Sequence, residues 1–331
     1  MINYAKNKIE ITNTLNKKYY LITGCAGFIG YHLSIKLLKK GKKVIGIDNL
    51  LSNNTSSSLK KKRLEEICKH KNFIFYKINL NSNSINNIFK KHVITHVFHL
   101  AAIAGVRYSF KYPDKYIYSN INGFYNIAKL SVKHKVKKFI YASSSSVYGE
   151  NKSKQFSEKH NTDKPLQLYA VTKKSNEIMA NFLSNHFKIP FIGLRFFTVY
   201  GPFGRTDMAP HIFINSIINR KKILLHNSGK HKRDFTYIDD IVNNMFLISN
   251  SKILDKKISN DNEYNYIFNI GSGNQISILN YIKIIEKITG LKANTKNIQL
   301  QPGEILNTLS NNKNIFNFTN YKSMYDIGLG T

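Results

Sequence analysis

The sequence predicts an α/β protein with a Rossmann-type, doubly wound parallel sheet and a smaller C-terminal α/β lobe. From residue 19 to about 200, short β-branched or aromatic runs alternate with longer helical stretches, as in parallel sheets with crossover helices. After residue 201 the alternation weakens around Pro202, Gly204 and Pro210. We therefore divide the chain into a polar N-terminal extension (1–18), a sheet domain (19–200) and mainly a second lobe (201–331).

The expected elements follow from run length and periodicity. The runs with strand length are residues 19–23, 43–47, 72–76, 95–100, 138–143 and 190–195. The stretches with helical length and mixed faces are residues 29–40, 85–91, 116–134 and 168–187. Ligands of open parallel sheets bind outside the carboxyl ends of the strands, so we expect the second lobe to close over that edge.

The composition excludes several classes of protein. A chain of 331 residues with 42% hydrophobic residues can bury a sizeable core, which excludes a disordered tail. The formal charge of +31 is what a nucleic-acid binder would show, but the basic residues are spread along the whole chain among Asn and Ile. A general Lys/Asn bias explains them, so we expect no nucleic-acid partner.

Cysteine usage and hydropathy point to the cytoplasm. Cys25 and Cys68 are the only cysteines, which implies no disulfide framework and fits a reducing compartment. No apolar run reaches the roughly 18 residues of a membrane span, and the polar N-terminus lacks the apolar core of a signal peptide. We therefore expect no membrane partner. We also expect no metal, because the 11 His residues show no spacing typical of metal ligands.

A glycine-rich segment follows the first expected strand. Gly24, Gly27 and Gly30 would let the backbone approach a pyrophosphate at a helix N-terminus, although a plain tight turn would explain the glycines alone. Asp48 ends the second strand 18 residues after Gly30, close to the spacing of about 20 at which an acid binds the ribose hydroxyls of NAD. No Arg stands beside Asp48 to receive a 2′-phosphate, so the sequence favours NAD over NADP.

A second pattern pairs Tyr169 with Lys173, one helical turn apart, behind a strand that ends in the serine run 143–146. A neighbouring ammonium and a cationic nicotinamide would lower the pKa of the tyrosine toward that of a usable base. In isolation such a pair favours an ordinary helix surface, because the chain has 20 Tyr and many Lys. The serine hydroxyls at the strand end favour the catalytic interpretation.

With these patterns, the sequence resembles the extended short-chain dehydrogenase/reductases that act on nucleotide sugars, within the NAD-dependent epimerase/dehydratase family. The stretches 104–109, 141–149, 194–202, 204–208 and 233–240 are similar to those of UDP-glucuronate 4-epimerases. This resemblance makes residues 19–200 an NAD-binding domain and the lobe a nucleotide-sugar-binding one. It also implies a homodimer formed through the helices within 116–134 and 168–187.

The resemblance assigns roles residue by residue. Tyr169 would be the base, Lys173 its activator and a ribose contact, and Ser144 the hydroxyl partner. NAD would also be held by Gly24, Gly27, Phe28, Ile29, Gly30, Asp48, Asn49, Asn79, Leu80, Leu100, Ala101 and Ala102. The substrate would contact Ser145, Ser146 and Thr198 near the sugar, Arg233 at the diphosphate, and Arg205, Gln301 and Glu304 around the uridine end. Arg107 would be a further substrate-binding residue. For Arg233 the alternative is a surface salt bridge with an acid such as Asp234.

The chemistry implied is 4-epimerisation. Related dehydratases and decarboxylases have an acid just before Val147-Tyr148-Gly149, where this chain has only serines. We expect conversion of UDP-glucuronate to UDP-galacturonate through a 4-keto intermediate, with NAD retained. The UDP-galacturonate would be supplied for the synthesis of a surface polysaccharide. The alternatives are a UDP-glucose or UDP-N-acetylglucosamine 4-epimerase, and a truncated fold that binds NAD or nucleic acid without catalysis.

Three positions depart from the family pattern. Asn79 stands where the family has Asp, which predicts weaker NAD binding because an amide still accepts a hydrogen bond. Ile103 replaces a usual glutamine beside the cofactor. The sequence stops at Thr331, where the family continues into a last helix, and such a loss would uncover apolar surface and reduce stability.

Overall fold

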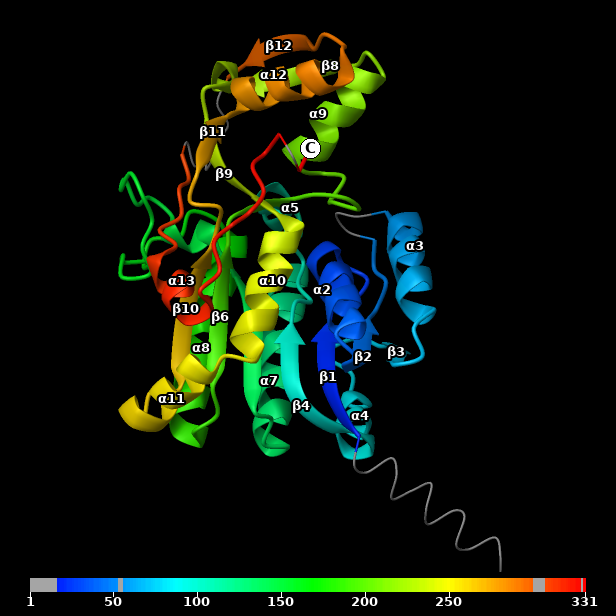
Figure 1. Cartoon of the computed structure of the whole chain (residues 1–331), viewed down its shortest axis with the longest axis vertical. Coiled ribbons are helices and arrows are strands. Elements are labelled where there is room, and N and C mark those ends of the chain that lie inside the picture. Colours follow the sequence, from blue (N-terminus) through cyan, green and yellow to red (C-terminus); the bar gives the residue numbers. More distant parts are fainter. Residues whose placement is uncertain (1–16, 53–55, 300–306, 329) are drawn as a thin grey trace, which may run out of the picture.

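A seven-stranded parallel sheet forms the centre of the molecule (Figure 1). The computed structural model describes residues 17–52, 56–299, 307–328 and 330–331. The strand order is β3-β2-β1-β4-β5-β6-β10, and every neighbouring pair is parallel. The strands are β1 (Lys18–Thr23), β2 (Lys43–Asp48), β3 (Phe73–Lys77), β4 (Val93–His99), β5 (Lys138–Ser144), β6 (Phe191–Phe196) and β10 (Asn265–Ile270).

Each face of the sheet carries its own apolar core. Successive side chains of β1 point to opposite faces, so Tyr20 and Ile22 join one buried cluster while Tyr19 and Leu21 join the other. Because both faces are covered, the strands are nearly continuous runs of apolar residues. This explains why their sequence signal is hydrophobic length rather than alternation.

The helices form one layer on each side of the sheet. One apolar cluster includes residues of α2 (Phe28–Lys39), α3 (Ser57–Cys68), α10 (Ile238–Ser249), α11 (Lys252–Asp261) and α13 (Lys313–Thr319). The other includes residues of α4 (Ile85–Lys91), α7 (Gly123–Lys133) and α8 (Leu168–Phe187). Before α7 lie α5 (Val106–Lys111), α6 (Pro113–Tyr116) and the π-helix η1 (Ile117–Asn122).

The second lobe lies beyond the carboxyl ends of the strands (Figure 1). It contains a three-stranded sheet of β7 (Thr198–Tyr200), β9 (Lys232–Tyr237) and β11 (Gln275–Ser277), and a parallel pair of β8 (Lys222–His226) and β12 (Asn294–Ile298). Its apolar core is built by α9 (Ala209–Ile218) and α12 (Ile278–Thr289) together with residues of β7, β8, β9 and β11. The second lobe therefore lies over the carboxyl ends of the strands, as expected from the sequence.

The predicted fold class is confirmed, and each of the six expected strands is present within two residues of its predicted ends. The helix α3 and the seventh strand, β10, were not predicted. The boundary at residue 200 divides the lobes only in part, because β10 pairs with β6 and α10 packs against α2. The chain thus returns to the large sheet after it enters the second lobe, which a contiguous division cannot describe. Among the described residues, no helix is both long and apolar enough to cross a membrane.

Candidate active site

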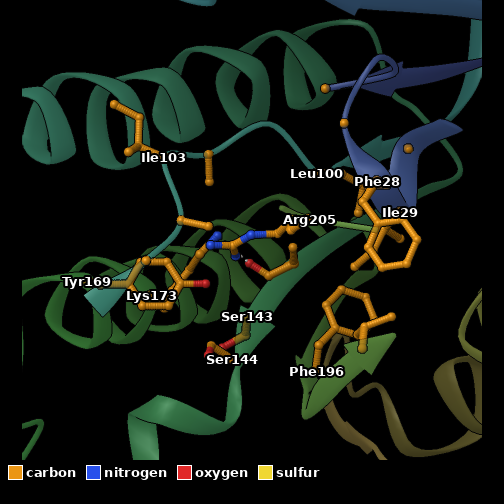
Figure 2. A pocket seen from close by; sticks show the side chains of 18 of the residues that line it. Phe28, Ile29, Leu100, Ile103, Ser143, Ser144, Tyr169, Lys173, Phe196 and Arg205 are labelled. Atoms are coloured by element: carbon orange, nitrogen blue, oxygen red, sulfur yellow. Dashed lines mark hydrogen bonds between the residues drawn. The ribbon is translucent and has the colours of Figure 1, made fainter. Parts of the chain in front are cut away.

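A cavity of about 380 Å³ opens where the loops after β1, β4, β5 and β6 meet. Such a position, at the carboxyl ends of parallel strands, is where open α/β sheets bind their ligands. Figure 2 shows Tyr169 and Lys173 of α8 on one side of it, Phe28 and Ile29 of α2 on another, and Arg205 pointing into it. Other lining residues include Gly24, Gly27, Gly30, Leu51, Lys60, Leu100, Ala102, Ile103, the serines 143–146, Phe196, Thr198 and Met208.

The glycine-rich turn packs too closely for side chains. Gly24 has φ +73°, and a Cβ there would lie 2.8 Å from the backbone nitrogen of Ala101. A Cβ on Gly27 would lie 2.9 Å from the Gly24 carbonyl oxygen, and one on Gly30 would overlap the same oxygen. Gly27 is also the N-cap of α2 and offers no side chain to its first amides. The turn therefore leaves a bare helix N-terminus facing the cavity, which favours an anion.

Asp48 lies buried behind this turn. Its carboxylate accepts hydrogen bonds from the backbone nitrogens of Ala26 (3.2 Å) and Leu50 (2.8 Å), and Lys60 of α3 approaches it at 3.4 Å. The sequence showed no Arg beside Asp48, but the fold brings this lysine to it. Lys60 lines the cavity, whereas Asp48 is not among its lining residues.

Tyr169 and Lys173 lie together at the wall of the cavity (Figure 2). The Lys173 Nζ atom donates to the carbonyl oxygen of Ala142 at 2.8 Å and lies 5.9 Å from the centroid of the Tyr169 ring. Burial lowers the pKa of Lys173 to about 8. Burial also raises the pKa of Tyr169, and the opposing effects of Arg205 and of a hydrogen bond with Ser144 do not reverse this. Among the protein's own groups desolvation therefore dominates, and the lowering expected from an ammonium and a cationic nicotinamide together stays a prediction.

The serine run forms a tight turn at the end of β5. Ser144 accepts hydrogen bonds from the backbone nitrogen (3.2 Å) and the hydroxyl (2.9 Å) of Ser146, at the start of the 3-10 helix η2 (Ser145–Tyr148). Ser143, Ser144, Ser145 and Ser146 all line the cavity, and Thr198 lines it from β7. The hydroxyl of Ser143 is bonded to Glu177. The cavity that Tyr169 lines is thus also lined by four other hydroxyl side chains, those of Ser144, Ser145, Ser146 and Thr198.

Arg205 extends into the cavity from the loop after β7. Its guanidinium forms a bidentate ion pair with Asp207, at 3.0 and 2.7 Å, and lines the same cavity as Tyr169. Its charge acts on the pKa of Tyr169. The assignment of Arg205 to the uridine end stays a prediction, and the structure adds that loop 201–208 brings this side chain into the cavity that Tyr169 lines.

Several predicted ligand residues lie outside this cavity. The Asn79 side chain accepts from the Asn81 backbone, the Asn49 side chain accepts from that of Leu51, and the Ala101 backbone donates to Thr23. Leu80 is buried. Arg233 extends from β9, where its guanidinium donates to the carbonyl oxygen of Lys232 at 3.1 Å. Gln301, Glu304 and the side chain of Arg107 lie outside the part of the chain that the structure describes.

Sequence reasoning missed the residue that positions the segment after β4. Asn120, buried in the π-helix η1, accepts from the Ile103 backbone nitrogen at 2.8 Å and donates to its carbonyl oxygen at 3.0 Å. It also donates to Thr172 of α8 at 3.2 Å. A π-helical turn places this amide where an α-helix would not, and no local sequence signal marks such a turn. The two hydrogen bonds with Asn120 therefore fix the backbone of Ile103 at the wall of the cavity.

Comparisons with known proteins agree with this geometry. The model of the NAD-dependent epimerase/dehydratase family matches residues 20–271. Protein CapI of Staphylococcus aureus is 43% identical over 91% of this chain and 92% of its own length, and a UDP-glucuronate 4-epimerase of Thermodesulfobacterium geofontis is 40% identical over 87% and 85%. The crystal structure of the UDP-glucuronic acid 4-epimerase from Bacillus cereus, in complex with UDP-glucuronic acid and NAD, superposes with a TM-score of 0.87 at 34% identity and covers 94% of this chain and 96% of that one.

Proposed function

The chain belongs to the NAD-dependent epimerase/dehydratase family, and we propose that it interconverts UDP-glucuronate and UDP-galacturonate with a retained NAD. One observation carries the proposal. The tyrosine, lysine and serine of a proton-transfer site line the same cavity as a glycine-rich helix N-terminus, and no carboxylate lines that cavity among the described residues. This combination suits oxidation and reduction at one carbon, without water elimination at its neighbour.

The residues present fit NAD. The turn at Gly24, Gly27 and Gly30 has no room for side chains and exposes the first amides of α2, which suits a pyrophosphate. Asp48 ends β2 behind the turn and is the residue that would bind the adenosine ribose, and Lys60 neutralises part of its charge. NAD, when bound here, supplies the acceptor and donor of the hydride at carbon 4 of the sugar.

The protein side chains handle the proton and the orientation of the sugar. In the proposed reaction Tyr169 takes the proton of the 4-hydroxyl, and Ser144, which is hydrogen-bonded to the tyrosine, shares it. Lys173 places a cation next to this pair. After the 4-keto sugar has turned over, Tyr169 returns the proton as the opposite face is reduced.

The charges and hydroxyls of the cavity favour a uronate over a neutral sugar. Three cationic side chains, Lys60, Lys173 and Arg205, line it, and so do Ser145, Ser146 and Thr198. A 4-keto uronate is a β-keto acid that readily loses CO₂. Hydroxyls that hold the carboxylate in an unproductive orientation would suppress that loss.

Proton NMR of purified protein with UDP-glucuronate, without added NAD, tests the proposal. We expect the signals of UDP-galacturonate to appear, which would establish the reaction and the retained cofactor together. Parallel incubations with UDP-glucose and UDP-N-acetylglucosamine address the neutral-sugar alternatives. Turnover of either of these without turnover of UDP-glucuronate would contradict the uronate assignment.

We further propose that the active form is a homodimer. Exposed apolar side chains recur on the helices expected to pair, with Val171, Ile178 and Phe182 on α8 and Tyr118 and Tyr125 on the preceding stretch. Ile178 and Phe182 are 60% and 63% exposed, and their spacing of four residues puts them on one helix face. Light scattering should give twice the chain mass, and Ile178→Asp should give the single-chain mass.

A place in the cytoplasm and a role in supplying a surface polysaccharide complete the proposal. The location rests on Cys25 and Cys68, which are both free and fit a reducing compartment, and the role rests on the proposed product, a sugar nucleotide that serves as a donor of uronate units. Fractionation of cells, followed by epimerase assay of each fraction, tests the location.

A further inference from the structure

A buried ion pair lies behind the serine turn and has no part in the proposed proton transfer. Glu177 of α8 and Arg195 of β6 have side chains that are 6% and 5% exposed. The guanidinium donates two hydrogen bonds of 2.8 Å, one to each carboxylate oxygen. Burial alone would lower the pKa of Arg195, but hydrogen bonding to Glu177 and its charge raise it overall, so the guanidinium stays charged.

This pair contacts both ends of the serine turn. On one side, the Ser143 hydroxyl donates to Glu177 Oε1 at 2.6 Å. On the other side, the Arg195 guanidinium stacks on the ring of Tyr148, 4.9 Å from its centroid, and the Tyr148 hydroxyl donates to Asn269 at 2.6 Å. Residues 144–147 therefore lie between Ser143 and Tyr148, and the same ion pair contacts both of these residues.

The pair also connects the turn to the helix of the tyrosine. Glu177 follows Lys173 by four residues and Tyr169 by eight in α8, so the three side chains lie on one face, one turn apart. β5, β6 and α8 thus meet at a single carboxylate. Because Ser144 extends from β5 and Tyr169 from α8, this carboxylate fixes the separation of the two elements that carry them.

We propose that Glu177 and Arg195 are positioning residues that hold the hydroxyls of Ser144, Ser145 and Ser146 in register with Tyr169. The inference rests on the proposed function, which assigns those hydroxyls to the sugar. The pair contacts Ser143 and Tyr148 at the two ends of the turn, so its proposed effect is on the position of the turn. A buried ion pair is weak evidence for stability, since apolar residues of similar volume often stabilise as well. The bidentate geometry supplies a fixed orientation that apolar packing lacks.

Three variants separate positioning from stability. The double variant Glu177→Met with Arg195→Met removes both charges together, so it leaves no unpaired buried charge. Ser143→Ala keeps the ion pair and removes only its bond to β5. The matched control is Asp255→Asn, which removes an ion pair (2.7 Å) with the buried Lys138 at the opposite end of β5.

We expect the double variant to lower kcat for UDP-glucuronate at least tenfold and Ser143→Ala at least threefold, with KM within threefold of the wild type. The share of consumed substrate that loses CO₂ should rise in the double variant and in Ser143→Ala, because the serine hydroxyls no longer hold the carboxylate of the sugar. The control should leave kcat and the CO₂ share unchanged. A double variant that melts within a few degrees of the wild type, with wild-type kcat and CO₂ share, would overturn the proposal. So would a loss of kcat that follows melting temperature across all three variants.

Hydrogen–deuterium exchange gives a readout that needs no substrate. Amides of residues 144–149 should exchange faster in the double variant and in Ser143→Ala than in the wild type or in the control. If the two variants exchange faster but the wild type itself turns over no UDP-glucuronate, the positioning role stands and the proposed function is rejected. Unchanged exchange together with unchanged kcat would reject the positioning role alone.

Discussion

Lys173→Met should stabilise the NAD-free protein while it abolishes turnover. The Lys173 side chain is buried, 2% exposed, and burial lowers its pKa from 10.5 to about 8. Each pKa unit corresponds to about 1.4 kcal/mol, so the ammonium at pH 7 costs the fold about 3 kcal/mol. Methionine has a similar length and no charge. Loss of the 2.8 Å bond to the Ala142 carbonyl oxygen offsets about 1 kcal/mol, which leaves an expected gain of about 2 kcal/mol.

The gain should depend on pH in a defined direction. Between pH 8 and 10.5 the folded protein has released the Lys173 proton while the unfolded chain still binds it, so the free energy of unfolding of the wild type rises through this window. The variant has no such rise. The gain in the variant should therefore be largest below pH 8. It should disappear as the pH approaches 10.5, where the cost of the buried charge has gone and only the loss of the bond to Ala142, about 1 kcal/mol, remains.

Urea unfolding at pH 7 and pH 10, followed by circular dichroism, measures both effects. Lys287→Met, at an exposed position in α12, is the matched control because it removes the same charge without relieving burial. It should change the free energy of unfolding little at either pH. A Lys173→Met protein that is no more stable than the wild type at pH 7, or whose gain is the same at pH 10, would refute the reasoning.

Three further outcomes are expected. Gly30→Ala should purify with little NAD, because its Cβ would overlap the Gly24 carbonyl oxygen, at a cost of about 1–3 kcal/mol; Gly41→Ala, whose Cβ has nothing within 4 Å, should retain NAD, and equal NAD content in the two variants would contradict this. Tyr169→Phe should lower kcat at least a hundredfold with unchanged NAD content, and a kcat near that of the wild type by NMR would exclude the tyrosine as the base. Asp234→Asn should lower the free energy of unfolding by about 2–4 kcal/mol in urea, since this buried carboxylate accepts hydrogen bonds from three backbone amides, and an unchanged value would show that those amides find other partners.

Local patterns in the sequence were enough for the sheet and for the composition of the site. Strand length, helix length and glycine spacing depend on neighbours within a few residues, so the six expected strands and the turn from Gly24 to Gly30 could be located directly. Tyr169 and Lys173 were recognisable because a helix puts residues four apart on one face. The serine run was recognisable because it ends a strand whose carboxyl end faces the ligand edge.

Only the tertiary structure decided how these residues meet and what their surroundings do to them. It brought Lys60 to Asp48, turned Arg205 toward Tyr169, and returned β10 to the large sheet. It also buried Tyr169, and this burial raises the pKa of the tyrosine. Each of these results depends on burial or on approach between segments distant in the chain, and neither leaves a periodic signal in the sequence. The bond from Ser143 to Glu177 is of the same kind, since it exists only because β5 and α8 pack together.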